Sequence, residues 1–464
     1  MSRARAGAVL GLSLAFAACA GSPPARPPLV PAAPGAAPAG AALAPDAPPT
    51  VDADVTFGSV DGITVLVRRM PGADFAAGQL YVRGGTRNWT AQNAGIEDIA
   101  FRVAAAGGTT SLDRSALSRS LAALGASLSG DAHNDFSGLY LKTPVSTWDG
   151  ALPLLAGAFL SPALPPDEIE LVRQQMLAEL HHEQESAEDQ LWTLERKQLF
   201  AGHPYANRSI GSLESVTSVA AGDVGPYLAR LRETSRLVFV AVGDLDPSHV
   251  FDQVRQLFGA LPRGSYVETL VQPLVFGSPR LSTLERKLPA SYCESAFPAP
   301  RWSDPDWSTG LVTMSGYSWR LWQEVRTKRN LAYAVSAYIN QNFATPFGAI
   351  EVTAVDPSAA MRVVLDEARR LQNEPMPDQE LAGFKAVFLT GYLEAHETPD
   401  GQAATLADAL LYAGDWHLAR TLPDRVRAVT AADVQAYAKK YLGHLQAAVV
   451  GDPHRVDAAI FTSL

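Results

Sequence analysis

The sequence has only two cysteines, Cys19 and Cys293, among its 464 residues. If Cys19 is lipidated or removed with a leader, no internal disulfide is possible in the mature chain. Beyond the N-terminus, the chain has no apolar run long enough to span a bilayer. The net charge of −10 excludes nucleic acid as an expected partner, because such binding requires clustered lysine and arginine.

Zinc-binding histidine motifs are also absent. The nine histidines form neither His-Glu-x-x-His nor His-x-x-Glu-His. The single cluster of histidines is HHEQE, at 181–185. Neighbouring residues on a helix point about 100° apart, so His181 and His182 are poorly placed to share one ion. We therefore expect a solvated helix face there, with a metal site as the weaker alternative.

The N-terminus carries targeting information. Arg3 and Arg5 precede the apolar run AGAVLGLSLAFAA, which predicts a signal peptide at 1–18. The run ends in FAAC, which resembles the bacterial lipobox and implies lipidation of Cys19. Ala20 resembles the outer-membrane sorting signal. We therefore expect a lipoprotein of a Gram-negative-type cell envelope, anchored in the outer membrane on its periplasmic face; the alternative is an ordinary cleaved signal.

Residues 19–50 follow as a proline- and alanine-rich stretch. Such a composition cannot bury a core and predicts a partly extended tether, at ~3.1 Å per residue where it adopts polyproline II.

The remaining chain repeats itself at one nearly constant offset. The matching pairs are Asp167 with Asp378 (378 − 167 = 211), Gly138 with Gly348 (348 − 138 = 210), and Asp244 with Asp452 (452 − 244 = 208). Three matches in one order indicate two homologous domains. We place them at 51–265 and 266–464, with the linker in 261–280. Runs of strand and helix patterns predict an α+β fold, each domain a mostly antiparallel sheet with helices packed on one face. One long helix is expected over 167–200.

The stretch GIEDIAFRVAAAGG at 95–108 is an amphipathic helix between glycines. It lies in order with YVRGGTRNW, LGASLSGDAHNDFSGLYL, HPYANRSIG, VGDLDP and GYSWRLWQEVRTKRNLAY. Together these segments resemble the insulinase/pitrilysin zinc peptidase family, especially its bacterial members similar to the mitochondrial processing peptidase.

That resemblance implies a degenerate zinc site in the N-terminal domain. Active members carry His-x-x-Glu-His on this helix, and a distant glutamate completes the site. Here Asp98 stands at the first histidine, Phe101 at the glutamate, Arg102 at the second histidine, and Glu179 at the distal ligand. Arg102 would repel Zn²⁺ and Phe101 cannot accept a proton, so we expect no metal in this chain. The two acids in the first turn of this helix, Glu97 and Asp98, are then expected to act as helix N-terminal charges. Glu179 is expected to be a solvated helix residue.

The C-terminal domain retains a second motif of the family. Arg326 and Tyr333, in RTKRNLAY, resemble the Arg/Tyr pair that holds substrate carbonyls and stabilises the oxyanion. The alternative is a surface charge and a core aromatic. Leu124, Gly125, Ala126, Ser127 and Leu128 match the region before the edge strand that pairs with the substrate backbone in the family. An ordinary sheet edge is equally expected there.

Some members of the family divide their labour between two subunits. One binds zinc, and its partner supplies Arg and Tyr. The resemblance therefore implies a non-catalytic, peptide-binding subunit that supplies Arg326 and Tyr333 to a His-x-x-Glu-His homologue, which holds the zinc. One alternative is a structural or interaction protein, like the peptidase-derived core subunits of respiratory complexes. Another is a stand-alone peptidase with an unusual metal site of Asp98, Glu179 and nearby histidines.

Overall fold

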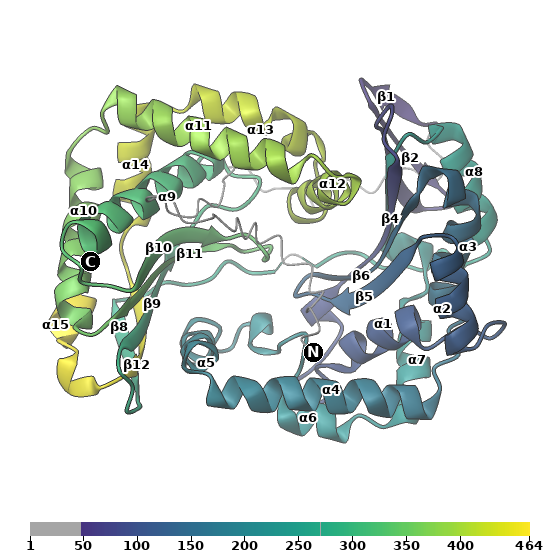
Figure 1. The fold of residues 1–464 in the computed structure, drawn as a ribbon, viewed down its shortest axis with the longest axis horizontal. Helices are drawn as coiled ribbons and strands as arrows, with labels where there is room; N and C mark the ends of the chain where they lie inside the picture. The colour runs from purple at the N-terminus through teal and green to yellow at the C-terminus, as the bar shows by residue number, and fades with distance from the viewer. Residues whose placement is uncertain (1–47, 270) are drawn as a thin grey trace.

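The computed structural model describes residues 48–269 and 271–464, which fold into two α+β repeats (Figure 1). The predicted signal peptide, Cys19 and nearly all of the predicted tether lie outside the described residues. No helix among the described residues has both the length and the apolar character needed to cross a membrane.

A seven-stranded sheet forms the first repeat, in the order β1-β2-β3-β7-β4-β6-β5. Its strands are β1 (Thr50–Asp52), β2 (Val55–Val60), β3 (Ile63–Arg69), β4 (Phe75–Arg83), β5 (Ser127–Ala132), β6 (Phe136–Pro144) and β7 (Leu237–Gly243). Its helices are α1 (Ile96–Ala106), α2 (Arg114–Ala123), α3 (Trp148–Leu160), α4 (Pro166–Glu185), α5 (Ala187–Leu199), α6 (Leu213–Ser218), α7 (Ala221–Leu231) and α8 (Pro247–Phe258).

A five-stranded sheet forms the second repeat, in the order β10-β11-β9-β12-β8. Its strands are β8 (Arg280–Glu285), β9 (Ser291–Pro298), β10 (Ala334–Asn340), β11 (Phe347–Ala354) and β12 (Gln446–Gly451). Its helices are α9 (Trp307–Leu321), the π-helical turn η5 (Trp322–Thr327), α10 (Pro357–Asn373), α11 (Asp378–Ala395), α12 (Pro399–Ala413), α13 (His417–Ala428), α14 (Ala431–Tyr441) and α15 (Ala458–Phe461).

The two sheets have the same topology, which confirms the predicted α+β pair of homologous domains. β3-β7-β4-β6-β5 corresponds to β8-β12-β9-β11-β10, and each sheet contains one parallel pair, β3–β7 or β8–β12. The remaining pairs are antiparallel. The boundary at 265/266 stays a prediction; the described residues between α8 and β8 form no helix or strand.

One match within the repeat is displaced by a residue. A side chain at Gly138 would meet Tyr140, whereas one at Gly348 would meet the Phe297 ring, in the core on the opposite face of its sheet. Phe136 and Phe347 lie on corresponding faces, with an offset of 347 − 136 = 211. Because side chains alternate along a strand, a slip of one residue moves each of them to the other face.

Each sheet is covered on its second face by a helix from the other repeat. α5 packs on β8, β9 and β12, and α12 packs on β4 and β7 (Figure 1). Under α12, Leu406 and Leu410 are buried against Leu66 and Val240 of the first sheet. Burying one such side chain fully contributes roughly 1.5–3 kcal/mol. The exchange of α5 and α12 therefore joins the repeats through two apolar layers.

The long helix predicted over 167–200 is two helices. Ser186 ends α4 in an extended conformation, and its side chain accepts a hydrogen bond from the Asp189 amide at the start of α5. A serine that caps the next helix breaks the helical path. This break lets α4 stay on its own repeat while α5 crosses to the other.

Candidate functional site

The predicted degenerate zinc site lies on α1, the helix that the resemblance equates with the zinc-binding helix of active peptidases. This helix begins after Gly95, whose φ of 96° and close contact with Val216 leave no room for a side chain. α1 then packs on β5, α4 and α7, which fixes the direction of its inner face.

Arg102 occupies the centre of the degenerate zinc site. Its guanidinium lies 2.9 Å from the Asp98 carboxylate and 3.2 Å from the Glu179 carboxylate. The structure thus brings together three of the four positions identified from the sequence. Glu179 is bound to Arg102 rather than simply solvated, although its side chain is still 39% exposed. A fixed organic cation stands between the two carboxylates, where Zn²⁺ would need to lie.

The Asp98 carboxyl has a strongly perturbed environment. Burial raises the pKa of Asp98 to about 6, although Arg102 opposes this shift. Asp98 also accepts a hydrogen bond from the Ala132 amide at 3.1 Å, at the end of β5. The guanidinium and the amide therefore hold Asp98 in place as a structural carboxylate that joins α1 to the edge strand.

Glu97 is a buried anchor that the sequence analysis did not single out. It is fully buried and accepts hydrogen bonds from Tyr227 (2.5 Å), Asn88 (3.0 Å) and Ser137. Burial raises the pKa of Glu97, and these hydrogen bonds oppose the rise. The sequence predicts that Glu97 and Asp98 act as helix N-terminal charges, but both side chains are buried and hydrogen-bonded, so that prediction is incomplete. The one signal in the sequence that could have indicated their burial is an adjacent Glu-Asp pair on an otherwise apolar helix.

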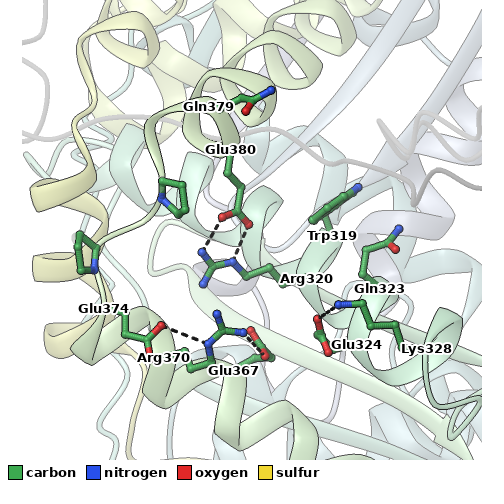
Figure 2. A pocket seen from close by; sticks show the side chains of 12 residues that line it. Trp319, Arg320, Gln323, Glu324, Lys328, Glu367, Arg370, Glu374, Gln379 and Glu380 are labelled. Atoms are coloured by element: carbon green, nitrogen blue, oxygen red, sulfur yellow. Dashed lines mark hydrogen bonds and ion pairs between the residues drawn. The ribbon is translucent and has the colours of Figure 1, made fainter.

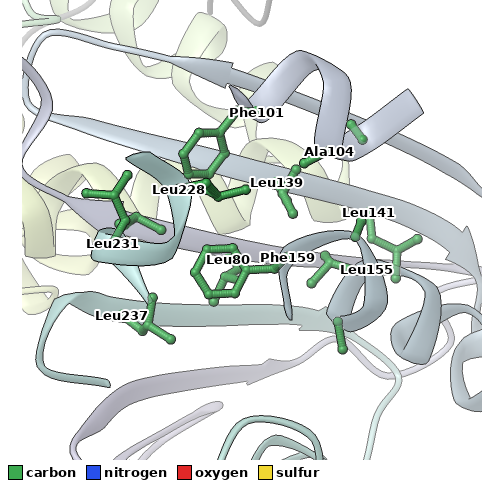
Figure 3. Packing of buried hydrophobic residues seen from close by; sticks show 14 of the residues in the cluster. Leu80, Phe101, Ala104, Leu139, Leu141, Leu155, Phe159, Leu228, Leu231 and Leu237 are labelled. Carbon is green, nitrogen blue, oxygen red and sulfur yellow. The ribbon is translucent and has the colours of Figure 1, made fainter. Parts of the chain in front are cut away.

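Phe101 stands where the catalytic glutamate would be. Its ring is fully buried in the core of the first repeat, together with Leu139 and Leu228 (Figure 3). A glutamate here would need to leave this core or be buried without a partner. The position serves packing and offers no general base.

The donor set does not fit a zinc ion. Among the described residues, no three or more His, Cys, Asp or Glu side chains come together in a way that could hold a metal. The HHEQE run therefore forms no such group either. Asp98 and Glu179 are already bound to Arg102. Both observations oppose the stand-alone peptidase with an unusual metal site.

Arg326 and Tyr333 lie together in the second repeat. Arg326 is on η5, and its Nη1 donates to the carbonyl oxygens of Ala332, at 3.1 Å, and of Tyr333. Its guanidinium also lies over the Trp322 ring, 5.0 Å from the centroid. The Tyr333 side chain is 62% exposed, at the start of edge strand β10. Arg326 therefore fixes the turn on which Tyr333 stands. Because Tyr333 is exposed, the alternative that it is a core aromatic is wrong.

The five positions predicted to bind substrate, 124–128, lie beside and at the start of β5, the last strand of the sheet in the first repeat. Leu124 caps α2, Gly125 has a φ of 64°, and Ser127 and Leu128 begin β5. Among the described residues β5 pairs with no strand other than β6. Its end at Ala132 is occupied by α1, since the Ala132 amide donates to Asp98, which leaves the start of the strand, at Ser127 and Leu128, as the part of the edge that another strand could reach. Arg102 and Tyr333 are in different repeats, and no hydrogen bond or ion pair within the described part of the chain joins them.

A pocket of about 540 Å³ opens beside η5 (Figure 2). Its cations already have carboxylate partners: Arg320 lies 2.7 Å from Glu380, and Lys328 lies 2.5 Å from Glu324. Arg370 is bound by Glu367 and Glu374. The pocket therefore presents paired charges, and its Arg320–Glu380 pair fixes α9 to α11 next to η5.

Fold and site together define a two-repeat α+β protein that resembles zinc peptidases but has no His-x-x-Glu-His motif. The family model described as Insulinase (Peptidase family M16) matches residues 64–211, and that described as Peptidase M16 inactive domain matches 223–388. The two ranges together cover more than half of the chain. The chain belongs to the insulinase (M16) peptidase family, as a homologue that lacks the zinc motif.

The relatives that match this chain include one described as a zinc protease and one described as a non-peptidase homolog. It is 25% identical over 411 residues to an uncharacterized zinc protease of Mycobacterium tuberculosis, covering 85% of this chain and 92% of that protein. It is 24% identical over 303 residues to the non-peptidase homolog YmxG of Helicobacter pylori, covering 63% and 69%. A solved structure, the peptidase M16 inactive domain from Pseudomonas fluorescens, has a TM-score of 0.77 at 20% identity, covering 86% and 98%. The last comparison shows the fold alone.

Replacing Arg102 with alanine leaves Asp98 and Glu179 without their shared cation. The free energy of unfolding should fall by about 1–3 kcal/mol. Burial raises the folded-state pKa of Asp98 to about 6 against the opposing charge of Arg102, so without Arg102 this pKa rises further. The variant then continues to lose stability at pH values above 6, where the unaltered protein no longer does. The loss should therefore be larger near pH 8 than near pH 5, measured by urea unfolding. Arg114→Ala, which removes an exposed ion pair with Glu168, is the control; an equal loss at both pH values would contradict this account.

Restoring two histidines should restore metal binding. In Asp98→His combined with Arg102→His, the cation is gone and two imidazoles one helical turn apart join Glu179. We expect about one zinc ion per chain by elemental analysis, against almost none in the unaltered protein. Adding Glu179→Ala should lower the zinc content again. Zinc bound equally well by the unaltered protein would show that Arg102 does not exclude the metal.

Proposed function

We propose that this chain is the non-catalytic, substrate-binding subunit of a heteromeric zinc metallopeptidase in the periplasm. Its partner is a homologue that carries His-x-x-Glu-His and holds the zinc. This chain supplies Arg326 and Tyr333 to the partner's active site and is anchored to the outer membrane through lipidated Cys19.

The observation that carries this proposal is the contrast between the two halves of the site. In the first repeat, the Arg102 guanidinium lies between Asp98 and Glu179, and Phe101 fills the place of the base. In the second repeat, Tyr333 is 62% exposed on a turn held by Arg326. A phenol in this setting supports a hydrogen bond to a substrate carbonyl or oxyanion held by another chain.

The position of β5 as the last strand of its sheet supports a role in substrate binding. An extended peptide can add to such an edge through backbone hydrogen bonds, which tolerate many sequences. In this proposal, residues 124–128 and the strand that follows them hold the peptide backbone while the partner cleaves it.

A second candidate is a structural or interaction protein with no role in proteolysis. One observation favours it: the Arg326 guanidinium donates to carbonyl oxygens of its own chain and stacks on Trp322, which is a sufficient structural role. Tyr333 separates the two candidates, because the residue is exposed and only the peptidase role requires its hydroxyl.

The deciding experiment is peptide cleavage by the complex of this chain with the zinc-binding homologue from the same bacterium. Tyr333→Phe removes one hydroxyl, and we expect kcat to fall by about 10²-fold, as when an oxyanion donor is lost. Arg326→Ala should lower cleavage as well. Arg329→Ala is the matched control, since Arg329 is bound to Glu324 on the same segment.

Cleavage should be absent with this chain alone. A Tyr333→Phe complex that assembles and cleaves at the unaltered rate would refute the catalytic contribution and leave the structural candidate.

A further inference from the structure

Three carboxyl side chains meet where α5 crosses onto the second repeat. Glu195 comes from α5, Glu294 from β9 and Glu351 from β11. Glu294 and Glu351 are directly opposite each other in the antiparallel register. Glu195 is 1% exposed and Glu294 is 4% exposed. This acidic cluster, Glu195–Glu294–Glu351, is therefore enclosed between a helix of one repeat and the sheet of the other.

The acidic cluster has too few donors for three ionised carboxylates. The Tyr338 hydroxyl lies 2.5 Å from Glu351 and 3.2 Å from Glu294, but it has only one proton to donate. Ser336 donates to Glu351 at 3.1 Å. No amide, hydroxyl or cationic donor among the described residues reaches the carboxyl oxygens of Glu195. Its partner is the Glu294 carboxyl, and a hydrogen bond between two carboxyls requires a proton on one of them.

The surrounding elements supply little positive charge. Besides Glu195, α5 carries Glu188, Asp189, Arg196 and Lys197, of which Lys197 is exposed. The charged or phenolic groups on the strands around the cluster are Arg280 and Glu285 at the ends of β8, Tyr292 on β9 and Tyr338 on β10. β12 has none. Arg196 donates to the Tyr205 carbonyl oxygen and lies over the Trp192 and Phe200 rings. Its charge opposes the rise in the pKa of Glu195, but burial and Glu294 outweigh it.

Buried carboxylates without a cation hold protons at pH values where exposed ones do not. Burial, reinforced by Glu351, raises the pKa of Glu294 to about 8. Burial and the neighbouring Glu294 raise the pKa of Glu195 well above its ordinary value. At neutral pH the buried carboxyls of Glu195 and Glu294 therefore keep protons that they would release if α5 moved away and exposed them to water.

The corresponding place in the first repeat is built differently. There, Gln79 and Tyr140 face each other across β4 and β6, as Glu294 and Glu351 do across β9 and β11. Under α12, burial raises the pKa of Asp408 to about 7, but the charge of His133 opposes the rise. Only the α5 side therefore combines an acidic strand pair with a buried acid on the crossing helix.

We propose that the Glu195–Glu294–Glu351 cluster is a proton-dependent latch that holds α5 of the first repeat on the inner sheet of the second. With its protons bound, the cluster is neutral enough to stay buried. When they are lost, repulsion between the carboxylates favours release of α5 and opening of the two repeats. This latch is independent of the proposed peptidase role.

The direction of the pH effect follows from linkage. The folded-state pKa values of Glu195 and Glu294 are raised, so the folded protein binds protons that the unfolded chain has released. The stability contribution of the latch is therefore highest near the ordinary value of 4.5 and falls as pH rises toward about 8.

Glu195→Gln tests the latch because an amide keeps the shape and removes one titrating group. For the unaltered protein, we expect the urea midpoint to fall and the radius of gyration from small-angle X-ray scattering to rise between about pH 5.5 and 8.5. In Glu195→Gln both changes should shrink, and its urea midpoint near pH 8.5 should exceed that of the unaltered protein. Glu294→Gln is the second variant if the first does not fold.

The matched control is Glu185→Gln, at an exposed carboxylate at the end of α4. It should keep the pH dependence of the unaltered protein. A radius of gyration and urea midpoint that do not change with pH in the unaltered protein would overturn the proposal. So would an undiminished pH dependence in both Glu195→Gln and Glu294→Gln.

Discussion

The ion pairs between Arg102, Asp98 and Glu179 are the contacts on which the interpretation of this molecule depends. They join α1, which carries the arginine, to α4, which carries the glutamate, at the place where active relatives bind zinc. A guanidinium is a permanent, planar cation, so it neutralises the two carboxylates while leaving no vacant position for water or substrate. The same contacts that stabilise the helices thus exclude the chemistry.

The second constraint is the exchange of α5 and α12 between repeats. Neither sheet is covered on both faces by its own helices, so each repeat needs the other to bury its second face. α4 and α5 are consecutive, with Ser186 between them. The Arg102–Glu179 ion pair and the proposed latch therefore lie on two consecutive helices, α4 and α5.

The sequence predicted the repeated fold well because three segments recur in one order. The sequence also singled out Asp98, Arg102 and Glu179, which the structure brings together in two ion pairs; that they mark a former zinc site stays a prediction. It could not show that Glu97 and Glu195 are buried, because charged residues on helices are usually exposed. Nor could it show that α5 leaves its own repeat: Ser186 is tolerated within helices, and only tertiary packing reveals that it caps a new one. The sequence also paired Gly138 with Gly348, which face opposite sides of their sheets. Local sequence similarity does not fix which face of a strand a residue occupies.

The proposed two-subunit peptidase would account together for the exposed Tyr333 beside Arg326 and for the missing His-x-x-Glu-His motif. The most direct test is purification of the tagged chain from its native membranes in mild detergent, with the bound proteins identified by mass spectrometry. A stoichiometric partner that carries His-x-x-Glu-His is the expected result. Recovery of this chain alone, or with unrelated envelope proteins only, would contradict the account.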